Sequence, residues 1–170
     1  MERLRKGNHP RIIWTPMPEE LTKKKPKEVM KSKWLWESVA AENVLFFTGN
    51  GVFCSNSPKR IEDFLDGNDY VGVPWGNHGG TGGDATSHSL RKRSDMIRIL
   101  EKFDPEPEMD AQDSHYFAKH LIQEGTAKMA NKTTTVLFGG ITDDLETAPF
   151  VVAGTQDRLT FERREALLMV

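Results

Sequence analysis

The hydrophobic and polar positions of this chain form short apolar runs separated by longer stretches with helical spacing. The short runs are rich in β-branched and aromatic residues and are closed by glycine, proline or asparagine, a pattern typical of strands. They lie at 11–14, 43–47, 52–54, 70–73, 133–138 and 150–153, and a polar strand follows at 87–91. Apolar residues three to four apart predict helices at 94–103, 111–123 and 161–169, a short helix after Ser32, and one or two turns at 61–65.

Two serines are placed to begin helices. Ser32 and Ser94 each precede an apolar-periodic stretch, where a serine side chain accepts hydrogen bonds from free amides. The stretch 21–30 is lysine-rich and contains Pro26, which favours a loop or a marginal helix. Since strands and helices mix along the whole chain, the pattern predicts an α/β or α+β class with a mostly buried sheet. We expect a basic, partly irregular segment at 1–32 and one folded domain at 33–170.

Composition narrows the class of protein without identifying a function. With 37% hydrophobic and 28% charged residues, the 170 residues suit one globular domain. The net charge of −2 creates no general attraction to nucleic acid, so we expect no nucleic-acid partner. The lysine cluster at 23–33 is interpreted as a solvated basic surface rather than an anion-binding patch. Cys54 is the single cysteine, which excludes an intrachain disulfide and a four-cysteine zinc site.

No apolar run approaches the roughly 20 residues that cross a bilayer, so we expect no transmembrane segment in this chain. The first residues lead into no apolar core of a signal peptide. The localisation is therefore left open.

A glycine-rich loop at 79–83, followed by Asp84, is the most unusual segment of the chain. Glycines such as Gly82 and Gly83 let backbone amides approach a ligand closely, which suits a phosphate or a diphosphate. The loop is not a nucleotide-binding P-loop, because no Gly-Lys-Ser/Thr follows it. A merely flexible loop explains the same residues equally well. Trp75, just before the loop, is placed either to stack on a ligand or to pack into the core.

The polar strand after the loop carries His88 and Arg91. Their odd spacing predicts that the two side chains point to opposite faces of the sheet. Arg91 begins a basic run that suits contact with a diphosphate, and a solvated strand end is the alternative. His78, Asp84, His88 and Asp113 also suggest a metal-dependent hydrolase, but no tight ligand spacing supports it. Structural or hydrogen-bonding roles for the histidines are favoured.

Asp113 is the strongest candidate for catalysis. Asp110 or Ala111 begins its helix, so Asp113 lies in the first turn, where the helix dipole favours a negative charge. A carboxylate there either satisfies free amides as a cap or takes a proton from a substrate hydroxyl. Spacing does not choose between these roles. Cys54 has no base partner nearby in sequence and is interpreted as a core residue.

Taken in order, several segments resemble an uncharacterised glycosyltransferase-like family that is common in fungi and classed as a domain of unknown function. The resemblance covers most of the chain from about residue 33 onward, and the individual motifs are loose. The matching segments are 34–37, 41–47, 52–55, 61–65, 70–75, 89–94, 113–117, 138–140 and 151–155.

The family is similar to sugar-nucleotide-dependent transferases of the GT-A type, which have a Rossmann-like mixed sheet flanked by helices. The resemblance implies transfer of a sugar from a nucleotide-sugar donor to a glycan or another hydroxyl acceptor. It implies Asp113 as the base, with Asn50, Trp75, Gly82, Gly83, Asp84, His88 and Arg91 as substrate contacts. It also implies Mg²⁺ or Mn²⁺ against the donor diphosphate. Relatives of this type often work in the secretory pathway.

Three departures from the family pattern qualify this expectation. Asn50 stands where members usually carry the metal-coordinating aspartate, and it offers only a neutral carbonyl ligand. Gln112 replaces the usual glutamate before Asp113. We also expect that the N-terminal strand–helix units of a GT-A sheet are missing from this chain, as in a truncated copy. These departures keep open an alternative, a non-catalytic carbohydrate- or partner-binding remnant of the same fold.

Overall fold

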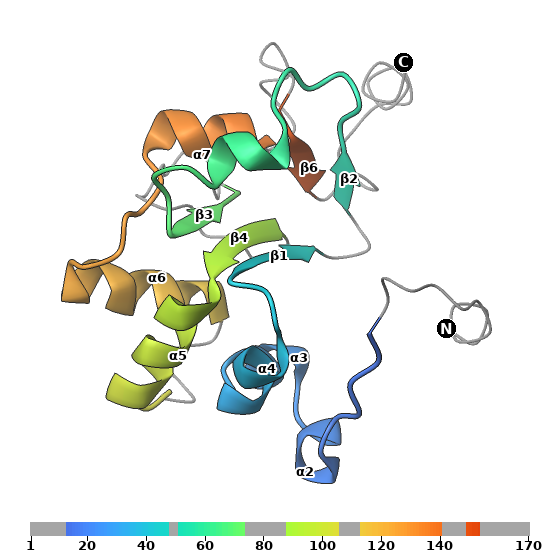
Figure 1. Cartoon of the computed structure of the whole chain (residues 1–170), viewed down its shortest axis with the longest axis vertical. Helices are drawn as coiled ribbons and strands as arrows, with labels where there is room; N and C mark the ends of the chain where they lie inside the picture. The colour runs from blue at the N-terminus through green and yellow to red at the C-terminus, as the bar shows by residue number, and fades with distance from the viewer. Residues whose placement is uncertain (1–12, 48–50, 74–87, 106–112, 141–148, 154–170) are drawn as a thin grey trace.

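The structure, a computed structural model, describes residues 13–47, 51–73, 88–105, 113–140 and 149–153. Its helices are α2 (Glu19–Thr22), α3 (Pro26–Met30), α4 (Lys33–Ser38), α5 (Arg93–Lys102), α6 (Asp113–Glu124) and α7 (Lys132–Phe138), with a 3-10 turn η1 (Ile61–Phe64). Its strands are β1 (Asn43–Phe47), β2 (Gly51–Phe53), β3 (Tyr70–Gly72), β4 (His88–Lys92), β5 (Gly139–Gly140) and β6 (Val151–Ala153). The class is therefore mixed α/β (Figure 1).

Two small sheets organise these elements. In the first sheet the order is β1-β4-β3, and β4 pairs antiparallel with both neighbours. In the second sheet the order is β2-β6-β5, in which β2 pairs antiparallel and β5 pairs parallel with β6. Figure 1 shows the first sheet across the middle of the described part, with α4, α5 and α6 on one side and α7 and the second sheet on the other.

The first sheet separates two hydrophobic clusters. The helix-side cluster consists of Trp36, Tyr70, Met96, Ile99, Leu100, Tyr116, Phe117 and Leu121. The cluster on the α7 side consists of Phe64, Val71, Val73, Leu90, Ala130, Phe138 and Val151. Alternate residues of each strand supply the two clusters, because successive side chains of a strand point to opposite faces. Strand β4 is buried on both faces as a result.

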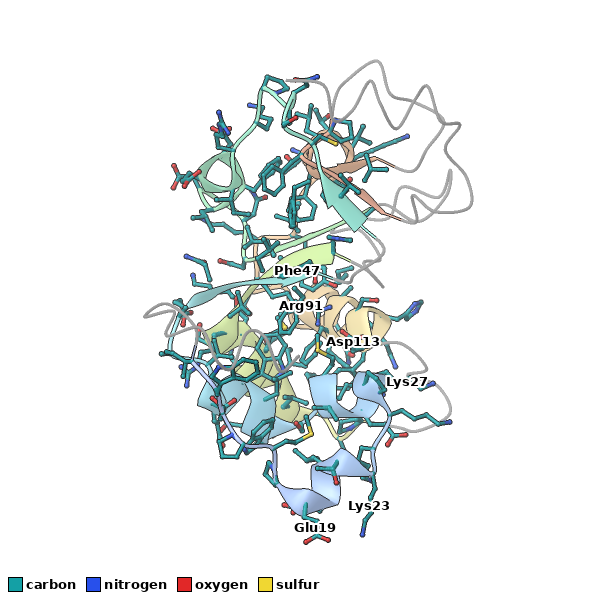
Figure 2. The ribbon with its side chains drawn as sticks, turned by 90° about the vertical axis from the view of Figure 1, so that its right-hand side faces the viewer. Glu19, Lys23, Lys27, Phe47, Arg91 and Asp113 are labelled. Atoms are coloured by element: carbon teal, nitrogen blue, oxygen red, sulfur yellow. The ribbon has the colours of Figure 1, made fainter. Side chains whose placement is uncertain are left out.

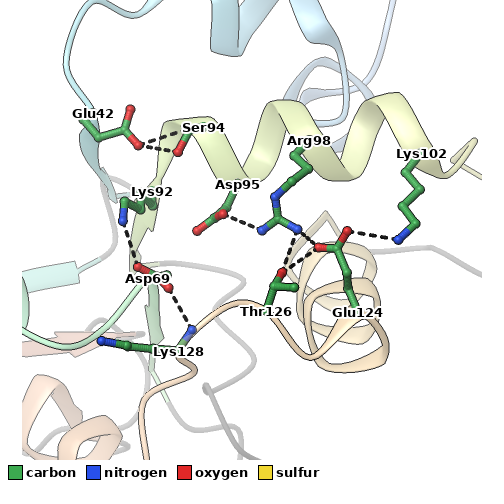
Figure 3. Close-up of polar contacts among 10 residues, drawn as sticks. All are labelled: Glu42, Asp69, Lys92, Ser94, Asp95, Arg98, Lys102, Glu124, Thr126 and Lys128. Carbon is green, nitrogen blue, oxygen red and sulfur yellow. Dashed lines mark hydrogen bonds and ion pairs between the residues drawn. The ribbon is translucent and has the colours of Figure 1, made fainter.

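The start of α5 differs from the prediction. Lys92 occupies the N-cap position, and Ser94 lies inside the first turn, so the prediction of Ser94 as the cap is wrong. The Ser94 hydroxyl donates instead to the Glu42 carboxylate, which also accepts from the Ser94 backbone N–H (Figure 3). Glu42, which lies in another part of the chain, thus supplies the acceptor that a capping side chain would supply at the helix start itself.

A polar network ties α5 to α6 (Figure 3). The Arg98 guanidinium contacts Asp95 on its own helix and Glu124 at the end of α6, and Lys102 reaches the same glutamate. Asp69, before β3, holds the Lys92 ammonium at 3.1 Å and accepts from the Lys128 backbone N–H at 2.8 Å. The first contacts join α5 to the end of α6, and those of Asp69 join the end of β4 to the segment that follows α6.

The segment 133–138 was predicted as a strand and is helical, so this prediction is wrong. Asn131 is the N-cap of α7, and its side chain accepts from the Thr134 backbone N–H at 2.9 Å. The buried Thr135 and Phe138 lie three residues apart, which places both on one face of a helix. This cap and the packing of Phe138 outweigh the preference of consecutive threonines for extended structure.

Most other elements follow the pattern of the sequence. The cap at Ser32 is confirmed, because its side chain accepts from the Leu35 backbone N–H. The strands predicted near 43–47, 52–54, 70–73, 87–91 and 150–153 are present within about a residue at each end. The lysine-rich stretch 21–30 forms parts of two short helices, whereas Ile13 and Trp14 are not in a strand. The predicted helix at 161–169 lies outside the described residues.

Candidate functional site

Three of the predicted site residues can be located. These are His88, Arg91 and Asp113, and all three are buried. The other predicted contacts, Asn50, Trp75, Gly82, Gly83 and Asp84, lie outside the described residues, as does His78.

Arg91 and Asp113 form an ion pair inside the molecule (Figure 2). Arg91 Nη2 lies 2.8 Å from Asp113 Oδ2, and the two side chains are 1% and 12% exposed. Arg91 Nε donates a hydrogen bond to Ser89 Oγ at 2.8 Å, from the same face of β4. Arg91 is thus held at two of its nitrogens, and the prediction of a solvated strand end for Arg91 is wrong. Contact between Arg91 and a diphosphate stays a prediction.

Aromatic rings surround the Arg91 guanidinium. Its Cζ lies 5.2 to 6.0 Å from four ring centroids, those of Phe46, Tyr70, Phe117 and Trp36. A cation over the face of a ring is attracted by the ring quadrupole, by about 2 kcal/mol when both groups are desolvated. The rings come from α4, β1, β3 and α6, so the arginine connects the sheet to its covering helices.

Asp113 begins α6, where the helix dipole favours a negative charge. Its partner Arg91 projects from the central strand of the sheet, so a buried cation and the helix start fix the carboxylate together. The Asp113 side chain is 12% exposed, and its Oδ2, which faces Arg91, is buried. The arrangement suits a carboxylate that stays in one position and accepts a proton from a bound hydroxyl. It also suits a purely structural pair.

His88 points away from this pair, as its odd spacing from Arg91 predicts. Its ring lies against Gly51 and packs edge-on to Phe53 at 5.9 Å between centroids. Burial lowers the pKa of His88 below its usual 6.5 and favours the neutral ring. Neither ring nitrogen has a hydrogen-bond partner in the described part of the chain. The side chains of His88 and Arg91 thus lie on opposite faces of β4, and contact of His88 with a substrate stays a prediction.

Ser89 was not among the predicted site residues. The available signal was its position two residues before Arg91, which puts both side chains on one face of a strand. The interpretation of Cys54 as a core residue agrees with its burial, which raises the pKa of the thiol to about 11. Within the ranges that the structure describes, no group of three or more histidine, cysteine or acidic side chains is placed to hold a metal ion.

A family model described as "Protein of unknown function (DUF5672)" matches residues 17–144. This match spans most of the chain, and the chain therefore belongs to this family. Comparisons with curated proteins and with solved structures gave no match. No helix in the described ranges is long and apolar enough to span a membrane.

Proposed function

We propose that the chain is a glycosyltransferase-like domain of the GT-A type, which transfers a sugar from a nucleotide-sugar donor to a hydroxyl acceptor. In this proposal Asp113 takes the proton of the acceptor hydroxyl. The acceptor oxygen then attacks the anomeric carbon, and the nucleoside diphosphate leaves with the electron pair of the broken bond. The observation that carries the proposal is the carboxylate fixed at the start of α6, within an ordered series of segments that resembles such enzymes.

Fixed position is what general-base catalysis requires of Asp113. A base acts when it lies within hydrogen-bond distance of the proton that it removes, and a mobile carboxylate satisfies this only part of the time. Arg91 holds Asp113 from the sheet side, and Ser89 holds Arg91. In this proposal Arg91 is a positioning residue, since its guanidinium is 1% exposed and touches Asp113.

The residue at the expected metal-binding position of this chain is a poor ligand for a divalent cation. The position that the family likeness assigns to a metal-binding aspartate carries Asn50, whose amide oxygen is neutral. Mg²⁺ and Mn²⁺ prefer carboxylate ligands, so we derive no step through a metal ion.

The test is titration calorimetry with a panel of nucleotide sugars, followed by assays of donor hydrolysis and of transfer to sugar acceptors. We expect Asp113→Asn to lower turnover by about 10²-fold or more, because the amide accepts no proton. Donor affinity should change little. Asp66→Asn is the matched control, since Asp66 is exposed. Absence of binding and of hydrolysis with every donor would overturn the proposal.

A second candidate is a non-catalytic binding domain for a carbohydrate or a protein partner. The observation that favours it is the ion pair itself, because a buried Arg91 already accounts for the presence of Asp113. The double variant Asn50→Asp/Gln112→Glu restores the two acidic residues of the family pattern. Metal-dependent donor hydrolysis by this variant would argue against a mere binding domain.

A further inference from the structure

A cavity of about 480 Å³ opens beside α2 and α3, on a part of the chain that the proposed function does not use. Three lysines, Lys24, Lys27 and Lys31, line it together with a single carboxylate, that of Glu28, among the described residues. The cavity therefore carries a formal charge of about +2 in a chain whose net charge is −2. Pockets of about 300 to 1,000 Å³ are the size that small ligands occupy.

The three lysines come from neighbouring positions around α3 and line the same space. Lys27 lies in α3 and Lys31, four residues later, is its C-cap residue, so two like charges line the cavity close together in the chain. Both are half-buried, so water screens their repulsion less than at an open surface. Lys31 Nζ also lies 5.8 Å from the centre of the Tyr116 ring, which fixes the ammonium over α6. An anion in the cavity relieves this repulsion.

The walls of the cavity are not entirely polar. Leu21 on α2 and Pro105, after α5, supply apolar surface to the same space. The Ser32 hydroxyl, although it lines the cavity, already donates to the Val29 carbonyl and caps α4. Recognition of a charged ligand is thus left to the ammonium groups, which bind phosphate as point charges.

We propose that this cavity binds a soluble organic phosphate. The phosphate lies among Lys24, Lys27 and Lys31, and the rest of the ligand lies against Leu21 and Pro105. This inference is independent of the proposed transferase, because the cavity contains none of its predicted site residues. It revises the interpretation of the lysine cluster as a merely solvated surface.

The test is titration calorimetry with inorganic pyrophosphate and with adenosine diphosphate as probes, at low salt. The cavity variant is Lys24→Gln/Lys27→Gln, which leaves Lys31 and its contact with Tyr116 in place. The control is Lys23→Gln/Lys25→Gln, which removes the same charge from neighbouring residues that do not line the cavity. Lys23 lies with Glu19 at the far end of the described part, away from Lys27 (Figure 2).

We expect the wild-type chain to bind both probes, more weakly as salt rises, because dissolved ions screen the attraction between the lysines and the phosphate. The cavity variant should lose about tenfold or more in affinity, and the control should change by less than about twofold. Equal loss in the control and the cavity variant would overturn the proposal, since it would show only diffuse charge. Binding to vesicles that contain a phosphoinositide, without binding to either soluble probe, would also overturn it.

Discussion

Asp113→Asn tests whether the buried ion pair is energetically coupled to the fold. The two charged atoms lie 2.8 Å apart, and at an effective dielectric constant of 20 their attraction is about 6 kcal/mol. Removing both groups from water offsets most of this, at several kcal/mol per ion. The variant keeps the shape of Asp113 but leaves the Arg91 charge uncompensated among aromatic rings. We expect a loss of about 3 kcal/mol in the free energy of unfolding.

The assay is urea denaturation followed by tryptophan fluorescence, since Trp36 lies beside Arg91. With a slope of about 2 kcal/mol per M for a domain of this size, the expected loss lowers the midpoint by about 1.5 M. Arg91→Met and the double variant Arg91→Met/Asp113→Asn complete a double-mutant cycle. Asp66→Asn is the control, and its midpoint should move by less than about 0.3 M.

The double variant measures the coupling energy between Arg91 and Asp113. It contains no buried charge at these positions, so its loss of stability should be smaller than the sum of the two single losses by about 1 to 3 kcal/mol. Additive losses, with a coupling below about 0.5 kcal/mol, would refute the reasoning. They would mean that Asp113 and Arg91 do not interact in solution as they do in the structure.

Three further predictions concern single sites in the described residues. Gly51→Ala would place a Cβ 1.8 Å from His88 Cε1, so the free energy of unfolding should fall by about 1 to 3 kcal/mol. The melting temperature measures this loss, and an unchanged melting temperature contradicts the packing of His88 against Gly51. Burial lowers the pKa of His88, so just below pH 6.5 the imidazole takes up a proton in the unfolded chain but not in the folded one. The free energy of unfolding therefore falls as the pH drops from 7 toward 5. His88→Leu should flatten that slope in urea titrations, and an identical slope shows that another group titrates. Burial raises the pKa of Cys54 to about 11, so a chromogenic disulfide reagent at pH 8 should label the native thiol about 10²-fold more slowly than the urea-unfolded one, and equal rates refute its burial.

Local patterns in the sequence predicted where the strands and helices lie better than which strands pair with each other. Apolar runs located β1, β3 and β6, because buried strands need such residues whatever they pair with. The pairing of β1 with β4 joins residues more than forty positions apart, and no local pattern encodes that register. The error at 133–138 has a different cause, since three threonines favour a strand while Asn131 gives the competing signal of a helix cap.

The site was predicted only as far as single residues. Asp113 and Arg91 were both predicted as site residues. The odd spacing between His88 and Arg91 correctly predicted that these two side chains lie on opposite faces of the strand. The contact between Arg91 and Asp113 was not predicted, because it depends on how α6 packs on the sheet. An arginine within a strand whose other face carries Leu90 was the available hint of burial. The lysine cavity was not predicted because it forms between two short helices and Pro105, which lies more than 70 residues further along the chain.

The ion pair also separates the two candidate functions. Apolar residues of equal volume usually stabilise a core at least as well as a buried ion pair, so packing alone is a weak reason to keep Arg91 and Asp113. A transferase needs the carboxylate for chemistry, whereas a binding remnant needs only a stable sheet and helix. Arg91→Met/Asp113→Asn removes the chemistry while leaving most of the packing. If this variant unfolds like the wild type but loses donor hydrolysis, the pair serves catalysis. If the wild type hydrolyses no donor and the variant still binds every ligand of the wild type, the pair is structural and the transferase assignment fails.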